Sequence, residues 1–102
     1  MRRQASMMAI LAATAQGGAM AGDVEWGAYL AAECTTCHRR DGSADGIPAI
    51  TGWPEAGFVA ALRAYRGGAR SSQTMQTVAR GLDDGDIAAL AAYFATYPPA
   101  AD

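Results

Sequence analysis

The run Cys34-Thr35-Thr36-Cys37-His38 constrains this chain more strongly than any other feature of its sequence. The pattern C-x-x-C-H is typical of a covalently attached c-type haem. The 102 residues contain no other cysteine and no other histidine. Two cysteines three positions apart at the end of a helix lie on the same side, so both sulfurs can reach one edge of a porphyrin. His38 then projects beneath the ring, where it can ligate iron.

Other functions of a C-x-x-C pair are weaker interpretations. A structural zinc site needs four Cys or His ligands, and this chain offers three. A thioredoxin-like redox pair belongs in a βαβ context, which the helical pattern described below contradicts. A plain structural disulfide is the remaining alternative. Haem attachment is therefore the favoured interpretation.

The N-terminus is typical of a secretory signal. Arg2-Arg3 gives a positive start, residues 5–15 are mostly apolar, and Ala19-Met20-Ala21 gives an A-x-A cleavage site. An ordinary amphipathic helix is the alternative, but no acid precedes Asp23 and Gly17-Gly18 would break such a helix. An uncleaved leader could act as a membrane anchor, although its apolar stretch falls well below the roughly 20 residues that a span needs.

Cleavage would leave one small domain, residues 22–102, which we expect in the periplasm. A core of this size is marginal, so a covalently held macrocycle would also stabilise the fold. Because the leader contains two arginines and no acidic residue, its removal would change the formal net charge from −2 to −4. A mildly acidic chain without lysine argues against a nucleic-acid partner, and we expect no stable membrane insertion.

Helical periodicity without an alternating strand pattern predicts an all-α domain. We expect helices over residues 24–36, over 54–66, and from after Asp83 to Pro98-Pro99, with a shorter helical piece over 73–80. Each of the three longer segments shows apolar residues at helical spacing. The expected stripes are Trp26, Leu30 and Glu33-Cys34 in the first segment, Phe58, Leu62 and Tyr65 in the second, and Ile87, Leu90, Ala91 and Phe94 in the third.

The ends of these segments carry recognisable capping signals. Asp23 suits the N-cap of the first helix, and Pro54 suits the first turn of the second. Gly67-Gly68 would stop the second helix. The carboxylates of Asp83, Asp84 and Asp86 are explained by capping and by the helix dipole, so we assign them no catalytic role.

The loop from Arg39 to Trp53 is long for so small a domain, which predicts that it wraps around something, here the haem. Its apolar stretch is Ile47-Pro48-Ala49-Ile50. A ligating histidine normally donates its other ring N–H to a carbonyl or carboxylate. We therefore expect the backbone carbonyl of Pro48 to accept that hydrogen bond from His38.

Met75 is the candidate for the second iron ligand. A lone methionine is usually core filler, but Met75 is the only methionine after residue 21 and lies in a polar stretch. A thioether ligand favours the reduced state and raises the reduction potential. With His38 and Met75 both bound to iron, the expected chemistry is outer-sphere electron transfer. Side chains that could bind the haem propionates are Trp53, Tyr65, Arg66 and Arg70.

These features together resemble the class I c-type cytochromes over essentially the whole of residues 22–102. The stretches that carry the resemblance are residues 27–30, 47–52 and 90–94, together with the attachment motif and Met75. The resemblance implies a small class I cytochrome c fold, with three to four helices wrapped around one covalent haem. It also implies that the first and last helices cross near a haem edge, with Trp26, Gly27 and Leu30 at the contact.

More narrowly, residues 58–68 and 74–82 resemble the cytochrome subunit of flavocytochrome c sulfide dehydrogenase and the cytochrome c4 and c553 types. This resemblance implies an electron-accepting subunit whose redox partner is an FAD-containing sulfide dehydrogenase. The alternatives are a freely diffusing electron carrier, a monohaem subunit of a sulfite dehydrogenase, and a haem-based gas sensor with an open sixth position. As a dehydrogenase subunit or as a free carrier, the chain would carry no substrate chemistry of its own.

Overall fold

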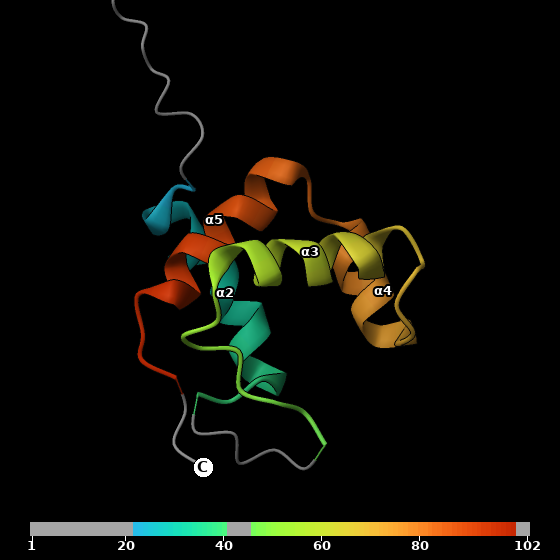
Figure 1. Cartoon of the computed structure of the whole chain (residues 1–102), viewed down its shortest axis with the longest axis horizontal. Coiled ribbons are helices and arrows are strands. Elements are labelled where there is room, and N and C mark those ends of the chain that lie inside the picture. Colours follow the sequence, from blue (N-terminus) through green and yellow to red (C-terminus); the bar gives the residue numbers. More distant parts are fainter. Residues whose placement is uncertain (1–21, 41–45, 100–102) are drawn as a thin grey trace, which may run out of the picture.

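The computed structural model describes residues 22–40 and 46–99, and within these ranges the chain forms four α-helices (Figure 1). They are α2 (Val24–Cys37), α3 (Glu55–Arg66), α4 (Gln73–Arg80) and α5 (Asp84–Ala95). The predicted all-α fold is confirmed, whereas the expected leader lies outside the described residues. None of the described helices is long and apolar enough to cross a membrane.

The first helix, α2, begins where its capping signal predicted. The Asp23 carboxylate accepts a hydrogen bond from the backbone N–H of Trp26 at 3.1 Å, which satisfies a donor that the helix itself leaves unpaired. The buried residues of α2 are Gly27 and Ala31. The expected place of Trp26 in the apolar stripe is wrong, because its residue surface is 43% exposed. The fully buried positions of this helix are thus small residues, and Leu30 and Cys34 pack against the core beside them.

The last helix, α5, is capped on both sides of its first turn. Asp83 accepts a hydrogen bond from the backbone N–H of Asp86 at 2.8 Å, and the Asp86 carboxylate accepts one from the N–H of Asp83 at 3.0 Å. This reciprocal pair is a capping box, as the spacing predicted. The expected apolar stripe is buried throughout, since Ile87, Leu90, Ala91 and Phe94 are all at most 1% exposed.

The helices α2 and α5 cross at a contact that leaves no space for a side chain. A Cβ atom at Gly27 would overlap the backbone carbonyl of Ala89 and the side chain of Tyr93. Trp26 lies beside this crossing and donates its indole N–H to Asp86 at 2.8 Å. Gly27 is therefore the residue that sets how near the two helices approach.

The helix α3 packs across α5 and leads into α4, and α2 and α4 lie toward opposite ends of α3 in Figure 1. Its N-cap is Pro54, one residue before the helix, and Gly67 is its C-cap. The next residue, Gly68, has a φ of +86°, which favours glycine. On its inner face the ring of Phe58 stacks on that of Phe94, with centroids 5.6 Å apart.

The segment that follows the attachment motif is fastened to α5 at two points. The backbone N–H of Gly52 donates to the carbonyl of Phe94 at 3.0 Å. Arg40 donates to the Tyr93 hydroxyl at 3.0 Å, and its guanidinium lies 4.5 Å from the ring centroid of Tyr97. The Tyr93 hydroxyl in turn donates to the Tyr97 hydroxyl at 2.8 Å, and this hydrogen bond raises the pKa of Tyr93. Both flanks of the loop are thus held against the last helix.

We predict that Gly27→Ala destabilises the domain by about 1–3 kcal/mol or more, because the new methyl group must push α2 away from α5. The matched control is Gly57→Ala in α3, where an added Cβ meets nothing within 4 Å. This control should be neutral or stabilising by up to about 1 kcal/mol. Denaturant unfolding of both holo-variants measures the difference, and equal free energies of unfolding would contradict the proposed tight crossing.

Candidate haem-binding site

The attachment motif occupies the last turn of α2. Cys34 and Cys37 belong to the helix, and His38 is its C-cap, with its backbone N–H donating to the carbonyl of Cys34 at 2.7 Å. Both thiols are free; Cys34 is half-buried and Cys37 is exposed. Because the helix continues through Cys37, the two sulfurs leave the same end of α2, about one turn apart.

Burial, with a smaller contribution from the nearby Glu33 carboxylate, raises the pKa of Cys34 to about 11. Within residues 22–40 and 46–99, no three His, Cys, Asp or Glu side chains gather in a way that could hold a metal ion. The zinc alternative has no support in this arrangement.

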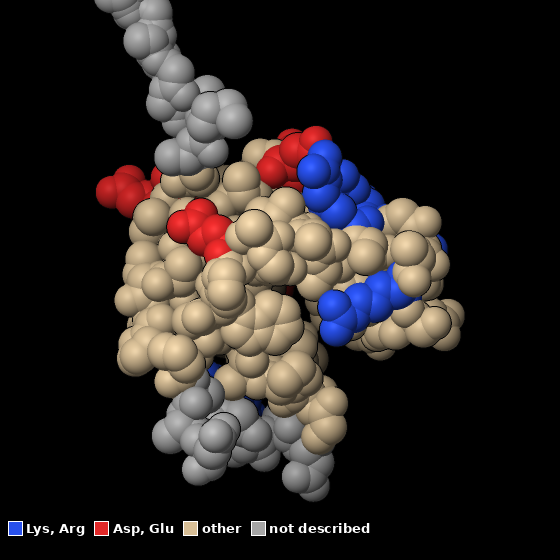
Figure 2. Space-filling view, in the orientation of Figure 1, with Lys and Arg blue, Asp and Glu red and all other residues tan. Residues whose placement is uncertain are grey.

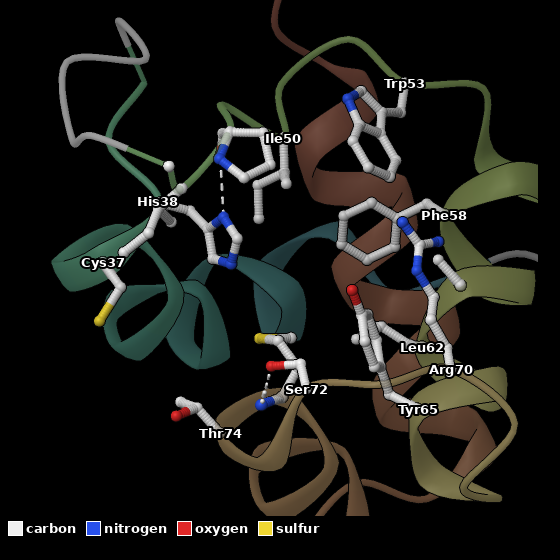
Figure 3. Close-up of a pocket in the computed structure, with 15 residues that line it drawn as sticks. Cys37, His38, Ile50, Trp53, Phe58, Leu62, Tyr65, Arg70, Ser72 and Thr74 are labelled. Atoms are coloured by element: carbon white, nitrogen blue, oxygen red, sulfur yellow. Dashed lines mark hydrogen bonds between the residues drawn. The ribbon is translucent and has the colours of Figure 1, made fainter.

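The imidazole of His38 is held in place by the loop that follows it. Its Nδ1 atom lies 2.7 Å from the backbone carbonyl oxygen of Pro48 (Figure 3). A carbonyl oxygen can only accept, so Nδ1 carries the proton and the lone pair is on Nε2. The hydrogen bond expected from the sequence is thus present, and it orients Nε2 for binding to a metal.

A mostly apolar cavity of about 390 Å³ lies beside His38 and is also lined by Met75. Its size falls in the range of ligand pockets, roughly 300–1,000 Å³. Figure 3 shows His38 facing this space, with the rings of Phe58 and Tyr65 across from it. The side chains that line the cavity include Ile47, Ile50, Trp53, Phe58, Leu62 and Tyr65.

A second cavity of about 360 Å³ lies on the cysteine side and shares Cys37 and His38 with the first. Its apolar lining comes from Leu30, Leu82 and Leu90. Two adjoining apolar spaces that meet at the attachment motif fit a broad, flat macrocycle joined to the protein along one edge. The residues present therefore fit a covalent haem.

Met75 is positioned by the start of α4. The hydroxyl of Ser72 caps this helix by accepting a hydrogen bond from the backbone N–H of Met75 at 3.1 Å. Gln76, the next residue, donates its side-chain amide to the carbonyl of Arg70 at 3.0 Å. These two bonds fix the turn that carries Met75 at the edge of the first cavity.

Three of the four candidates for binding the propionates line the first cavity, namely Trp53, Tyr65 and Arg70. The guanidinium of Arg70 lies 5.0 Å from the ring centroid of Tyr65. Arg66, the fourth candidate, does not line either cavity. It donates instead to the carbonyl of Leu82 at 3.2 Å and to Asp84 at 2.6 Å. This hydrogen bond from Arg66 is the main reason that the pKa of Asp84 is lowered.

Sequence reasoning missed two residues that organise the site. Ser72 directly precedes the helix that was expected over residues 73–80, and a serine immediately before a helix is a usable capping signal. Arg40 gave no such signal, because its partners Tyr93 and Tyr97 lie more than fifty positions away in the chain. Its contacts depend on the tertiary structure alone.

A haem attachment motif at the end of the first described helix, with a methionine on a later helix beside the same cavity, is the arrangement of a class I c-type cytochrome. Comparison with known families agrees, because residues 24–97 match the family model for cytochrome c. The chain belongs to the cytochrome c family. It carries one covalent haem c and transfers electrons.

Curated relatives include a single-domain cytochrome and a longer electron acceptor. Cytochrome c-554(548) of Halomonas halodenitrificans is 36% identical over 81 residues, which is 74% of this chain and 98% of the relative. The thiosulfate dehydrogenase electron acceptor of Thiomonas intermedia is 32% identical over 105 residues, covering 97% of this chain and 48% of the relative. The chain thus spans about half the length of the second relative.

Two solved structures share the fold. Thiosulfate dehydrogenase of Marichromatium purpuratum superposes with a TM-score of 0.69 and 32% identity, over 78% of this chain and 19% of that one. Reduced cytochrome c4 of Pseudomonas stutzeri superposes with a TM-score of 0.63 and 26% identity, over 76% and 52% of the respective chains. The predicted class I cytochrome c fold is confirmed.

We predict that Ser72→Ala lowers the free energy of unfolding by about 1 kcal/mol, because the N-terminal donors of α4 lose their cap. Ser71→Ala is the matched control, since Ser71 is exposed and an exposed substitution without a specific role changes stability by about 0.5 kcal/mol or less. Ser72→Asp should restore the lost stability. Denaturant titration of the three holo-variants checks this, and a Ser72→Ala variant as stable as Ser71→Ala would refute the capping role.

Proposed function

We propose that this chain is an exported one-electron carrier that accepts electrons from the oxidation of a reduced sulfur compound, with thiosulfate as the first candidate. The observation that carries the proposal is the 32% identity to a thiosulfate dehydrogenase electron acceptor over 97% of this chain. A thiosulfate dehydrogenase is also among the structures that share its fold, again at 32% identity.

Attachment and ligation of the haem are assigned to four residues. Cys34 and Cys37 would form the two thioether bonds, and His38, through Nε2, and Met75 would ligate the iron. The hydrogen bond from Nδ1 of His38 to Pro48 at 2.7 Å supports this orientation, and His38 and Met75 line one cavity. When bound, the haem supplies a centre that gains or loses one electron at a time.

The remaining residues of the first cavity have supporting roles. Trp53, Tyr65 and Arg70 supply hydrogen-bond donors, and among the described residues that line this cavity Arg70 is the one arginine or lysine. These donors suit the propionate groups of the haem, because carboxylates inside a protein need donors or cations. The apolar side chains of the same cavity exclude water from the iron ligands.

Export is part of the proposal. Residues 1–21, which lie outside the described residues, are assigned as a signal peptide that is cleaved near Ala21, so that the mature domain, residues 22–102, acts in the periplasm. Covalent haem attachment through two cysteines fits a compartment outside the cytoplasm. N-terminal sequencing of the native haem protein tests this assignment directly.

The sulfide dehydrogenase subunit inferred from residues 58–68 and 74–82 is the second candidate. A freely diffusing carrier is also supported, because a relative of nearly the same length as the mature domain exists as a separate chain. These possibilities differ in the donor and in whether the chain stays bound to it. The sulfite dehydrogenase alternative has no comparable observation in its favour.

The purified holo-protein, mixed with a thiosulfate dehydrogenase and thiosulfate, tests the donor. We expect the haem to be reduced at a rate set by the enzyme, as followed by its absorbance. When the enzyme is omitted, the haem should remain oxidised. A parallel reaction contains a flavoprotein sulfide dehydrogenase and sulfide. Reduction in the second reaction alone would replace thiosulfate with sulfide, and reduction in neither would overturn the proposed function.

The assignment of Met75 predicts a spectroscopic change. Met75→Ala should open the sixth position, so that the ferrous protein binds carbon monoxide and its reduction potential falls because the thioether is lost. Gln73→Ala, on the same helix and exposed, is the control and should bind no carbon monoxide. If the parent protein and Met75→Ala bind carbon monoxide equally, Met75 is not a ligand.

A further inference from the structure

One flank of α2 exposes large apolar side chains that nothing in the described structure covers. The rings of Trp26 and Tyr29 are stacked, with centroids 5.1 Å apart and planes 18° from parallel. Their residue surfaces are 43% and 71% exposed, and Val78 of α4 is 41% exposed. Exposed tryptophan and tyrosine are the residue types that most often carry binding energy at protein interfaces.

The aromatic stack is directed along the helix toward the attachment motif. Trp26, Tyr29, Glu33 and Cys37 follow one another at spacings of three and four residues, which places them on one flank of α2. Trp26 is fixed there by its indole N–H, which donates to Asp86 at 2.8 Å. The row therefore runs from a rigid aromatic pair to Cys37, whose surface is exposed.

The same flank borders the second cavity. Glu33, Cys34 and Cys37 of α2 line this cavity, together with Val78 of α4 and Asp86 of α5. Since the two cysteines would hold one edge of the haem and Cys37 is exposed, this edge would lie where the cavity meets the surface. We call the surface formed by Trp26, Tyr29, Glu33, Val78 and Asp86 the acidic edge.

The two cavities differ in the sign of the charges that line them. The lining of the second contains two carboxylates, Glu33 and Asp86, and no arginine. Among the residues that the structure describes, the lining of the first contains Arg70 and no carboxylate. Neither α2 nor α5 contains an arginine or lysine, and Figure 2 shows basic side chains on the side of the molecule formed by α3 and α4. Hydrogen bonds from Trp26 and Asp83 lower the pKa of Asp86, so it stays charged at neutral pH.

We propose that the acidic edge is the docking surface for a redox partner with a basic face, and that electrons enter or leave the chain there. The apolar centre and the acidic rim favour a partner that presents lysine or arginine around an apolar contact, because complementary charges steer the encounter. One electron passes from the reduced chain to the oxidised partner, with no proton transferred and no covalent bond changed. The inference rests on the one-electron role proposed above, but not on thiosulfate as the donor.

A pair of charge-reversal variants tests the docking surface. Glu33→Lys changes the acidic edge, and Glu55→Lys makes the same change of net charge at an exposed carboxylate in the first turn of α3, outside both cavities. The holo-proteins are reduced with dithionite, freed of excess reductant and mixed in a stopped flow with either of two oxidants. One is a basic blue copper protein with a positive net charge, and the other is the small anion hexacyanoferrate(III).

We expect Glu33→Lys to slow oxidation by the copper protein about tenfold at low ionic strength, and about 1 M salt to abolish most of this difference. With hexacyanoferrate(III) the same variant should react faster than the parent protein. Glu55→Lys should change either rate by less than about twofold. A change in the reduction potential of the chain would alter both oxidation rates in the same direction, so opposite effects with the two oxidants exclude it as the cause. The reduction potential of each variant is measured as a further check.

Tyr29→Ala separates the apolar contact from the charge. It should slow oxidation by the copper protein at both low and high salt, and leave the rate with hexacyanoferrate(III) unchanged. Equal effects of Glu33→Lys and Glu55→Lys, or no effect of either, would overturn the proposal. So would sedimentation that finds a dimer of the parent protein and a monomer of Tyr29→Ala, because the surface would then join two copies of this chain. None of these outcomes depends on the thiosulfate or sulfide reaction.

Discussion

The close crossing of α2 and α5 is the contact on which the rest of the structure depends. Gly27 allows the backbone of α2 to lie against the carbonyl of Ala89, and this fixes the direction in which α2 runs to its last turn. That turn carries both cysteines and His38. The position of the attachment motif relative to the core is therefore set by a residue without a side chain, ten positions before Cys37, the last residue of α2.

Each of the two proposed iron ligands is held by a hydrogen bond that involves a backbone group. Pro48 contributes its carbonyl to His38, and that loop is fastened to α5 through Gly52 and Phe94. Met75 is held by its own backbone N–H, bonded to Ser72, and the segment after α4 is tied to α3 through Arg66 and the carbonyl of Leu82. Each ligand thus belongs to a short segment whose two ends are attached to helices. Such support keeps the geometry nearly unchanged when an electron is gained or lost, which suits outer-sphere transfer.

Features encoded by neighbouring residues could be predicted from the sequence. The cap at Asp23, the capping box of Asp83 and Asp86, and the bounds of α4 all depend on positions within a few residues of one another, and all are present. The bond between His38 and Pro48 was predictable because a ligating histidine donates its other ring N–H and Pro48 lies in the apolar stretch of the loop that follows. The exposure of Trp26 and the contacts of Arg40 and Arg66 were not, because they follow from how near the helices approach. Periodicity places Trp26 at the edge of the inner face, and only the crossing at Gly27 decides that it remains outside.

The fold and the cofactor cannot be separated energetically. The cavity beside His38 has a volume of about 390 Å³ and a mostly apolar lining. A chain without haem would expose this lining to water, which is unfavourable in a domain whose total stability is only about 5–15 kcal/mol. Among the described residues, five of the eleven buried hydrophobic ones are alanines, so few large side chains are present to close that space. The haem would therefore complete the core as well as serve as the redox centre, and two thioether bonds would keep it in place in both oxidation states.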